Sequence, residues 1–174
     1  MISRRSIGLP GRARTAGFTL AELLLTISVL AILTALAAPS FNRFVQNNRL
    51  AGLGNEMVTA LQFARSEALK RGTTVRVCSS ADGVSCGGTW NQGFIALADP
   101  DPSGGELLRV WTAPGNEIQF TPGSGQVDFL GNGFAAAPLN VTLESDFCPP
   151  SSENARLITV ERTGRAASEA ELCP

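Results

Sequence analysis

The 174-residue sequence contains no histidine and no tyrosine. Histidine is the most frequent general base in enzymes and the usual partner of a nucleophilic serine or cysteine, so its absence removes the commonest catalytic arrangements. The sequence also lacks the G-x-x-x-x-G-K-[ST] loop of nucleotide-binding proteins and the G-x-S-x-G turn of hydrolases. We therefore expect no catalytic residue, no cofactor and no small-molecule substrate.

Candidate metal or phosphate ligands are few. Asp99 and Asp101 could bind a cation together, but prolines alternate with them, which favours a solvated loop. The glycine-rich segment 123–125 precedes a strand pattern rather than a helix, so a turn is favoured over a phosphate cradle. We expect no metal site.

Positive charge is concentrated at the N-terminus. The formal net charge is −1, and four of the fourteen basic residues (Arg4, Arg5, Arg12 and Arg14) lie in the first seventeen positions, which hold no acid. The remainder therefore carries ten basic and fifteen acidic residues, a charge of −5. This balance argues against binding of polyanions through bulk charge.

An apolar segment, 18–38, follows the basic N-terminus and carries one charged residue, Glu22. It is longer than the apolar core of a secretory signal and close to the ~20 residues that span a ~30 Å hydrocarbon layer. The sequence therefore predicts a transmembrane helix over 18–38, and the preceding arginines place its N-terminus in the cytoplasm.

The junction Gly17-Phe18-Thr19-Leu20-Ala21-Glu22 resembles the prepilin cleavage motif of type IV pilins and type II secretion pseudopilins. The resemblance implies that prepilin peptidase removes the leader 1–17 by cutting after Gly17. Phe18 then becomes the N-methylated first residue, and Glu22 becomes the glutamate that stands fifth in the mature chain. An alternative is a single-pass anchor that is never processed, with Glu22 near the membrane interface.

Glu22 has a physical reason to set the register between subunits. It lies four residues after Phe18, or ~6 Å along a helix, so a neighbour staggered by that rise brings its amine against the carboxylate. An unpaired carboxylate among apolar helices is strongly unfavourable, whereas a paired one selects one register.

The helical pattern continues over 39–72. Apolar residues recur mostly every three or four positions, as in an amphipathic helix; they are Phe41, Phe44, Val45, Leu53, Met57, Leu61, Ala64 and Ala68. Lys70 and Arg71 favour a helix C-terminus and Gly72 a C′ position. Gly52 and Gly54 each cost up to ~1 kcal/mol relative to alanine, which predicts local flexibility.

Short strand patterns separated by turn residues follow over 73–174. They are Thr73–Ser79, Trp90–Ala98, Glu106–Trp111, Ile118–Thr121, Val127–Leu130, Leu139–Leu143 and Leu157–Arg162. A long helix followed by antiparallel strands predicts an α+β fold, in which the amphipathic half of the helix packs against a β-sheet head.

Segments of this head resemble the GspH/FimT group of minor pilins and pseudopilins. They are EALKRG at 67–72, WNQGF at 90–94, IQF at 118–120, RLITV at 156–160 and Gly164-Arg165. The resemblance implies a low-abundance subunit of the bacterial inner membrane with a periplasmic head on two sheets. It assembles with other minor pilins and the major pilin or pseudopilin, at or near a fibre tip, and primes fibre assembly. Type IV pilus and type II secretion remain equally open.

The four cysteines (Cys78, Cys86, Cys148 and Cys173) all follow the predicted membrane span, on the oxidising side. Three pairings are compatible with four cysteines. We favour Cys78 with Cys86 across a hairpin loop, and Cys148 with Cys173 around the last predicted strand. A zinc site would need close ligand pairs, which these spacings do not supply.

The alternative function is a pilus-tip binding module, either a DNA-uptake receptor or an adhesin, that uses a C-terminal basic patch. Some FimT-like minor pilins capture DNA through a C-terminal segment resembling Gly-Arg-x-Arg. Here Gly164 and Arg165 match, but Ala167 replaces the second arginine. Arg156 and Arg162 lie nearby, and so do the acids Glu161, Glu169 and Glu171. This pattern favours a turn at Gly164 with Arg165 paired to an acid, and leaves DNA binding as the weaker interpretation.

Overall fold

The computed structural model describes residues 17–101, 104–112, 114–115, 117–123, 125–146, 148–150 and 152–173, without the side chains of 37–40, 42 and 43. The predicted leader, apart from Gly17, lies outside the described residues. The chain divides into two compact units, Met1–Phe41 and Asn42–Pro174. Helix α1, Leu20–Arg71, contributes to both of them.

Helix α1 ends where the sequence predicts. Gly72 adopts φ 69°, a conformation that favours glycine, and its N–H donates to the carbonyl of Ala68 at 2.9 Å. The predicted segments over 18–38 and 39–72 therefore belong to one continuous helix.

One face of α1 forms the helical side of the core in the second unit. Its buried side chains recur every three or four residues and are Leu50, Leu53, Met57, Ala60, Leu61, Ala64 and Ala68. Phe41 and Phe44 belong to the predicted apolar stripe but are each 65% exposed, so the buried part of the stripe lies further along the helix. Gly54 contacts the sheet directly: an added Cβ would lie 2.9 Å from Ser168 Oγ. Close packing against β8 favours a glycine at position 54, and the flexibility of this part of the helix stays a prediction.

Within the described residues the strands form two four-stranded antiparallel sheets. The first has the order β3-β2-β1-β5, with β1 at Val75–Ser79, β2 at Gly93–Asp101, β3 at Gly104–Thr112 and β5 at Gln126–Phe129. The second has the order β4-β6-β7-β8, with β4 at Ile118–Thr121, β6 at Leu139–Ser145, β7 at Ala155–Val160 and β8 at Ala166–Glu171. The α+β head on an antiparallel framework is confirmed.

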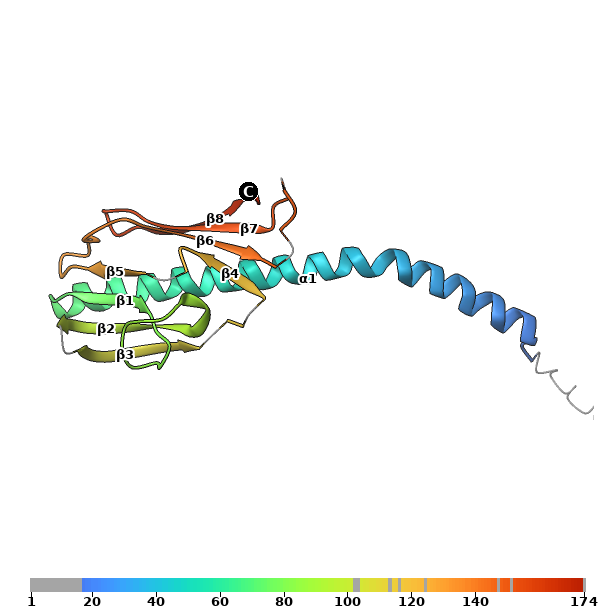
Figure 1. Cartoon of the computed structure of the whole chain (residues 1–174), viewed down its shortest axis with the longest axis horizontal. Coiled ribbons are helices and arrows are strands. Elements are labelled where there is room, and N and C mark those ends of the chain that lie inside the picture. Colours follow the sequence, from blue (N-terminus) through green and yellow to red (C-terminus); the bar gives the residue numbers. More distant parts are fainter. Residues whose placement is uncertain are drawn as a thin grey trace, which may run out of the picture. The chain divides into compact units, whose positions relative to one another are not determined.

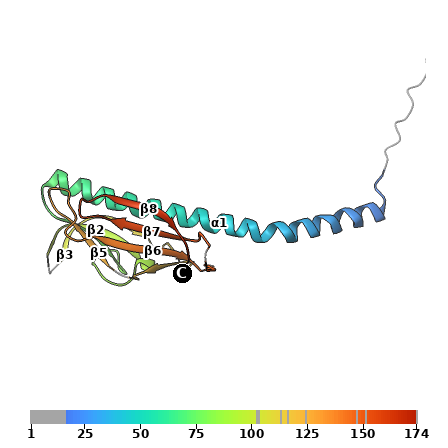
Figure 2. The same ribbon diagram turned by 90° about the horizontal axis from the view of Figure 1, so that it is seen from above.

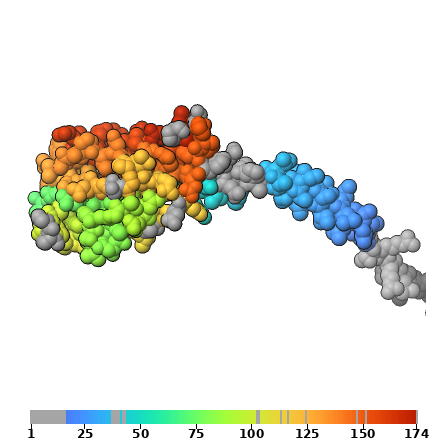
Figure 3. Space-filling model, viewed as in Figure 1, coloured from blue at the N-terminus to red at the C-terminus, as the bar shows by residue number. Residues whose placement is uncertain are grey.

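The core lies between the C-terminal half of α1 and the inner faces of both sheets (Figures 1 and 2). Large buried side chains come from all three layers, including Met57 of α1, Phe129 of β5 and Ile158 of β7. The space-filling view shows the green segment, which contains β1 and β2 of the first sheet, and the orange to red segment, which contains β6 to β8 of the second, on the same face of the head (Figure 3). Helix and sheets thus bury one shared apolar interior.

The observed strands differ from the predicted ones in several places. Trp90–Gln92 form a short 3₁₀ helix, and β2 begins only at Gly93. Asp99 and Asp101 belong to β2 rather than to a loop. Strand β8 was not predicted, because AASEAE has neither β-branched residues nor clear alternation; it forms by pairing along the whole of β7.

Candidate functional site

The predicted processing junction lies immediately before α1. Gly17, Phe18 and Thr19 precede the helix, and Phe18 is 77% exposed. The Thr19 hydroxyl accepts the N–H of Glu22 at 3.2 Å, and the Thr19 carbonyl accepts the N–H of Leu23 at 3.1 Å. Thr19 is therefore the N-cap residue, which leaves the Gly17–Phe18 bond outside the helix.

Glu22 occupies the third helical position after this cap. A glutamate there is stabilised by the positive end of the helix dipole, which gives the acid a local role as well as the predicted intermolecular one. Its side chain is exposed, and it forms no ion pair with any described residue. The carboxylate is thus available to a partner.

The first unit presents an apolar surface. Large side chains of α1 before position 37 are about half or more exposed, among them Leu20, Leu25 and Ile32. In the part of the chain that the structure describes, no helix meets the length and apolarity required of a membrane span. The transmembrane segment at 18–38 is therefore not confirmed.

Both predicted disulfides are present. Cys78 bonds to Cys86 with a Cα–Cα distance of 5.6 Å, and Cys148 bonds to Cys173 with a Cα–Cα distance of 5.5 Å. The first closes a short loop after β1, and the second joins the segment after β6 to the residues after β8. Each of the four cysteine sulfurs belongs to one of these two disulfides, so none is a free thiolate that could bind zinc.

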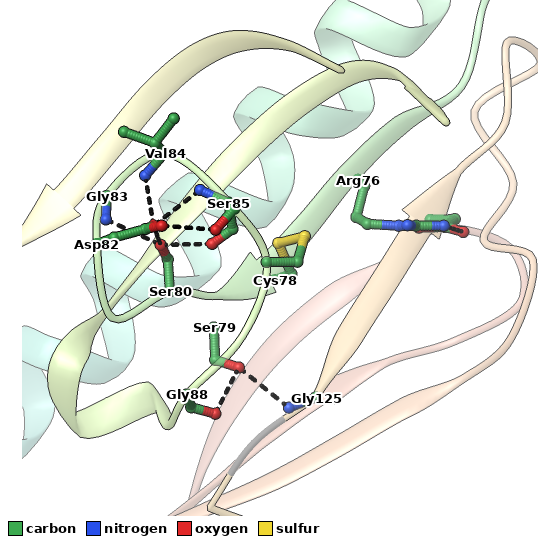
Figure 4. The surroundings of a disulfide bond; sticks show 12 residues. Arg76, Cys78, Ser79, Ser80, Asp82, Gly83, Val84, Ser85, Gly88 and Gly125 are labelled. Atoms are coloured by element: carbon green, nitrogen blue, oxygen red, sulfur yellow. Dashed lines mark hydrogen bonds and ion pairs between the residues drawn. A yellow bond between two sulfur atoms is a disulfide. The ribbon is translucent and has the colours of Figure 1, made fainter. Parts of the chain in front are cut away.

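The loop closed by Cys78 and Cys86 is organised around Asp82 (Figure 4). Its carboxylate accepts hydrogen bonds from the hydroxyls of Ser85, at 2.6 Å, and Ser80, at 3.0 Å. It also accepts the N–H groups of Ser85 and Val84, each at 2.8 Å. These bonds, led by that of the Ser85 hydroxyl, lower the pKa of Asp82 far below its usual value.

The structure separates the three arginines of the predicted DNA-binding segment. Arg156 lies half-buried on β7, and its guanidinium donates to the Ser168 hydroxyl at 3.2 Å. Arg162 and Arg165 are exposed in the turn between β7 and β8. Neither forms an ion pair with a described residue, so the expected pairing of Arg165 with an acid is not seen there.

Gly164 has the predicted turn role. It adopts φ 78°, and its N–H donates to the Glu161 carbonyl at 2.8 Å. An added Cβ would lie 2.9 Å from Arg65 Nε and would overlap the Gly133 carbonyl oxygen. Glycine is therefore required here both by the backbone conformation and by close packing.

Arg65 of α1 organises this region, and sequence reasoning missed it. Its guanidinium donates to the Gly133 carbonyl and to the Thr163 carbonyl, each at 3.0 Å. These hydrogen bonds connect the turn after β5 and the turn between β7 and β8 to α1. The sequence around Arg65 does not indicate these partners, because the two carbonyl groups lie 68 and 98 positions away.

Comparison with known proteins identifies the group. Residues 53–164 match the family described as type II transport protein GspH, and residues 12–38 match the prokaryotic N-terminal methylation motif. The chain belongs to the GspH family. No curated protein matches the chain by sequence.

Solved GspH-like structures share the fold at low identity. The type IV minor pilin FimU of Pseudomonas aeruginosa is 19% identical, with a TM-score of 0.54 over 72% of this chain and 92% of that one. The minor pseudopilin EpsH of the Vibrio cholerae type 2 secretion system is 15% identical, with a TM-score of 0.52 over 70% of this chain and 97% of that one. The pilin-like fold and the resemblance to minor pilins and pseudopilins are confirmed.

The two matched ranges contain the main residues of the sites described above. The motif contains the Thr19 cap and Glu22, and the GspH match contains Arg65, Gly133 and Gly164. The family and its solved neighbours are named as transport, pilin and pseudopilin proteins rather than as enzymes.

Proposed function

We propose that this GspH-family chain is a minor pilin or pseudopilin that assembles at or near the tip of a type IV pilus or type II secretion pseudopilus and primes the fibre. Prepilin peptidase cuts after Gly17, and Phe18 is then N-methylated. The observation that carries the proposal is the occurrence of a methylation motif and a GspH head on one chain. The exposed, non-helical Gly17–Phe18 junction supports it.

Before assembly, the apolar N-terminal segment is stored in the inner membrane and the head faces the periplasm. The exposed apolar side chains before position 37 and the two disulfides support this placement. The partners are prepilin peptidase, other minor subunits and the major pilin or pseudopilin.

The first test is the N-terminal sequence and mass of the full-length protein recovered from membranes with and without prepilin peptidase. We expect a chain starting at methylated Phe18 only when the peptidase is present. An intact leader in both strains would reject the proposal in favour of an unprocessed membrane anchor.

The second test separates the two roles of Glu22. Glutamine also suits the third position after a threonine cap, so Glu22→Gln keeps the local helix start and removes the charge. We expect Glu22→Gln to be processed normally but to be depleted from sheared fibres, whereas the exposed head variant Glu153→Gln should enter fibres at the wild-type level. Normal incorporation of Glu22→Gln would exclude a charge-based register role.

A second candidate function is capture of DNA at the fibre tip. Exposed Arg162 and Arg165, which lack ion pairs among the described residues, favour it. The test is a gel-shift assay at low salt with Arg165→Ala as control. Absence of a shift at micromolar protein would end this candidate.

A further inference from the structure

One end of the head gathers three segments that are distant in sequence. They are the last turns of α1 from Gln62 to Arg71, the turn at 130–135 after β5 and the turn at 161–165 after β7. The three segments lie together at the same end in Figure 1. Hydrogen bonds join them: Arg65 donates to the carbonyls of Gly133 and Thr163, and the N–H of Ala135 donates to the Arg162 carbonyl at 3.0 Å. The surface that these segments form is called the basic end.

The basic end carries positive charge that is not paired with a described acid. Arg162 and Arg165 are exposed and form no ion pair with a described residue. The acids of the same segments already have partners: Glu67 lies in ion pairs within α1, and Glu161 accepts the Thr163 hydroxyl at 3.2 Å. This surface can therefore bind an anionic group without breaking an ion pair, although the chain after position 17 has a net charge of −5.

Apolar side chains lie beside this charge. Leu69 of α1 and Phe134 of the turn after β5 are each 52% exposed. Their segments are in contact, because a Cβ added to Gly133 would lie 3.0 Å from the Leu69 side chain. A groove of about 340 Å³ is lined by Gln62 and Leu69 of α1 and by Arg165, among other residues. A carboxylate and an apolar group of one partner can therefore be bound side by side.

The basic end lies at the far end of α1 from the point where the helix enters the second unit. That unit begins at Asn42, and Leu50 is the first buried side chain of α1 that the structure describes. Nineteen helical residues separate Leu50 from Leu69, which is about 28 Å along the helix. Subunits of a fibre follow one another along its axis, so a surface at the end of a head faces an adjacent subunit.

We propose that the basic end binds an acidic, partly apolar surface of a different subunit of the same fibre. A partner carboxylate pairs with Arg165 in the groove, Arg162 adds a second positive charge, and apolar side chains of the partner cover Leu69 and Phe134. The inference rests on the proposed function and specifies the surface through which this subunit contacts a neighbour. The neighbour is a different chain, because a low-abundance subunit near a fibre tip is surrounded by other minor subunits and by the major subunit.

A protein partner explains the basic end better than DNA does. Affinity for DNA increases with the number of phosphates that cations neutralise, and only Arg162 and Arg165 are exposed here without a described ion partner. Exposed Glu161 in the same turn would repel a phosphate backbone. Exposed apolar groups with arginines beside them are instead typical of protein interfaces, in which an apolar centre is surrounded by a polar rim.

The direct test is zero-length cross-linking of the full-length chain in cells that make the other fibre subunits. A carbodiimide joins an amine only to a carboxylate in contact with it, so Arg165→Lys introduces a reactive amine at the basic end and keeps the charge. The matched control Gln126→Lys introduces the same amine at the opposite, exposed end of β5. We expect Arg165→Lys, but not Gln126→Lys, to be joined to an aspartate or glutamate of another pilin-type subunit, identified by mass spectrometry of the linked peptides.

A charge-reversal series measures how much the contact contributes. Arg162→Glu/Arg165→Glu should lower co-purification of the full-length chain with that subunit in non-ionic detergent by about tenfold or more, because like charges then meet at the contact. Arg162→Lys/Arg165→Lys should retain most of it, because the positive charge is kept, and high salt should weaken the wild-type interaction. Intact disulfides and native tryptophan fluorescence show that the charge-reversed variant is folded.

The possible outcomes separate this contact from the other interpretations. A cross-link from Arg165→Lys only to a second copy of this chain, or none beyond that of Gln126→Lys, would overturn the proposal. Unchanged co-purification of Arg162→Glu/Arg165→Glu would also overturn it, and if this variant at the same time lost binding of a labelled oligonucleotide, the basic end would be assigned to DNA. Removal of the leader is scored in the same cells: a retained leader in the wild type rejects the proposed function, whereas a processed chain that enters fibres without this cross-link rejects only the contact.

Discussion

Replacement of Gly164 by alanine tests whether this position is structural. Gly164 has φ 78° and lies against Gly133 and Arg65. The matched control is Gly72→Ala, because Gly72 has a similar φ of 69° but nothing within 4 Å of the position of an added Cβ. The two variants therefore share backbone strain and differ in crowding.

The expected losses follow from these contacts. A left-handed conformation costs an alanine about 1–2 kcal/mol, which sets the loss for Gly72→Ala. In Gly164→Ala the new methyl group also displaces the Gly133 carbonyl from Arg65, and a hydrogen bond from a charged donor contributes about 1.5–3 kcal/mol. We therefore expect Gly164→Ala to lower the free energy of unfolding by about 2.5–5 kcal/mol.

The assay is denaturant unfolding of the full-length chain in non-ionic detergent, followed by tryptophan fluorescence. Both tryptophans, Trp90 and Trp111, are buried in the head, so the signal reports the head alone. Equal losses for the two variants would refute the packing argument. A stable Gly164→Ala protein would also return Gly164 to the list of candidate functional residues.

Two further predictions concern stability. The Cys148–Cys173 bond joins residues 25 apart, and the Cys78–Cys86 bond joins residues 8 apart. Replacing the first pair by serine should therefore lower the free energy of unfolding by about 1 kcal/mol more than replacing the second. Equal losses in unfolding experiments would contradict the loop-entropy explanation. The lowered pKa of Asp82 stabilises the fold above the usual aspartate value of 3.8, and this contribution is lost as the pH falls through the lowered pKa. In Asp82→Asn, the free energy of unfolding should therefore decrease less steeply as the pH falls below ~4. The measurement is an acid titration followed by tryptophan fluorescence. The same acid dependence in wild type and Asp82→Asn would exclude Asp82 as a source of the loss.

Features made by neighbouring residues could be predicted from the sequence. The motif around Gly17 and Glu22 is contiguous, and the end of α1 at Gly72 follows from local backbone preference. The α+β class followed from the change of periodicity after the helix. The disulfide pairing was also predictable, because each pair of cysteines flanks the same loop or strand. These features depend on interactions that are short in sequence, and resemblance to pilins added the expected roles.

Contacts between distant segments were decided only by the tertiary structure. Arg65 binds carbonyls 68 and 98 residues away, and nothing near it in sequence signals either partner. Strand β8 has weak strand propensity and exists because β7 supplies a complete row of pairing partners. The turn after β5 and the turn after β7 likewise meet at the last turns of α1 because antiparallel strands return to the same end of the helix. Sequence periodicity assigns each segment its type, whereas long-range packing determines which charges and turns lie side by side.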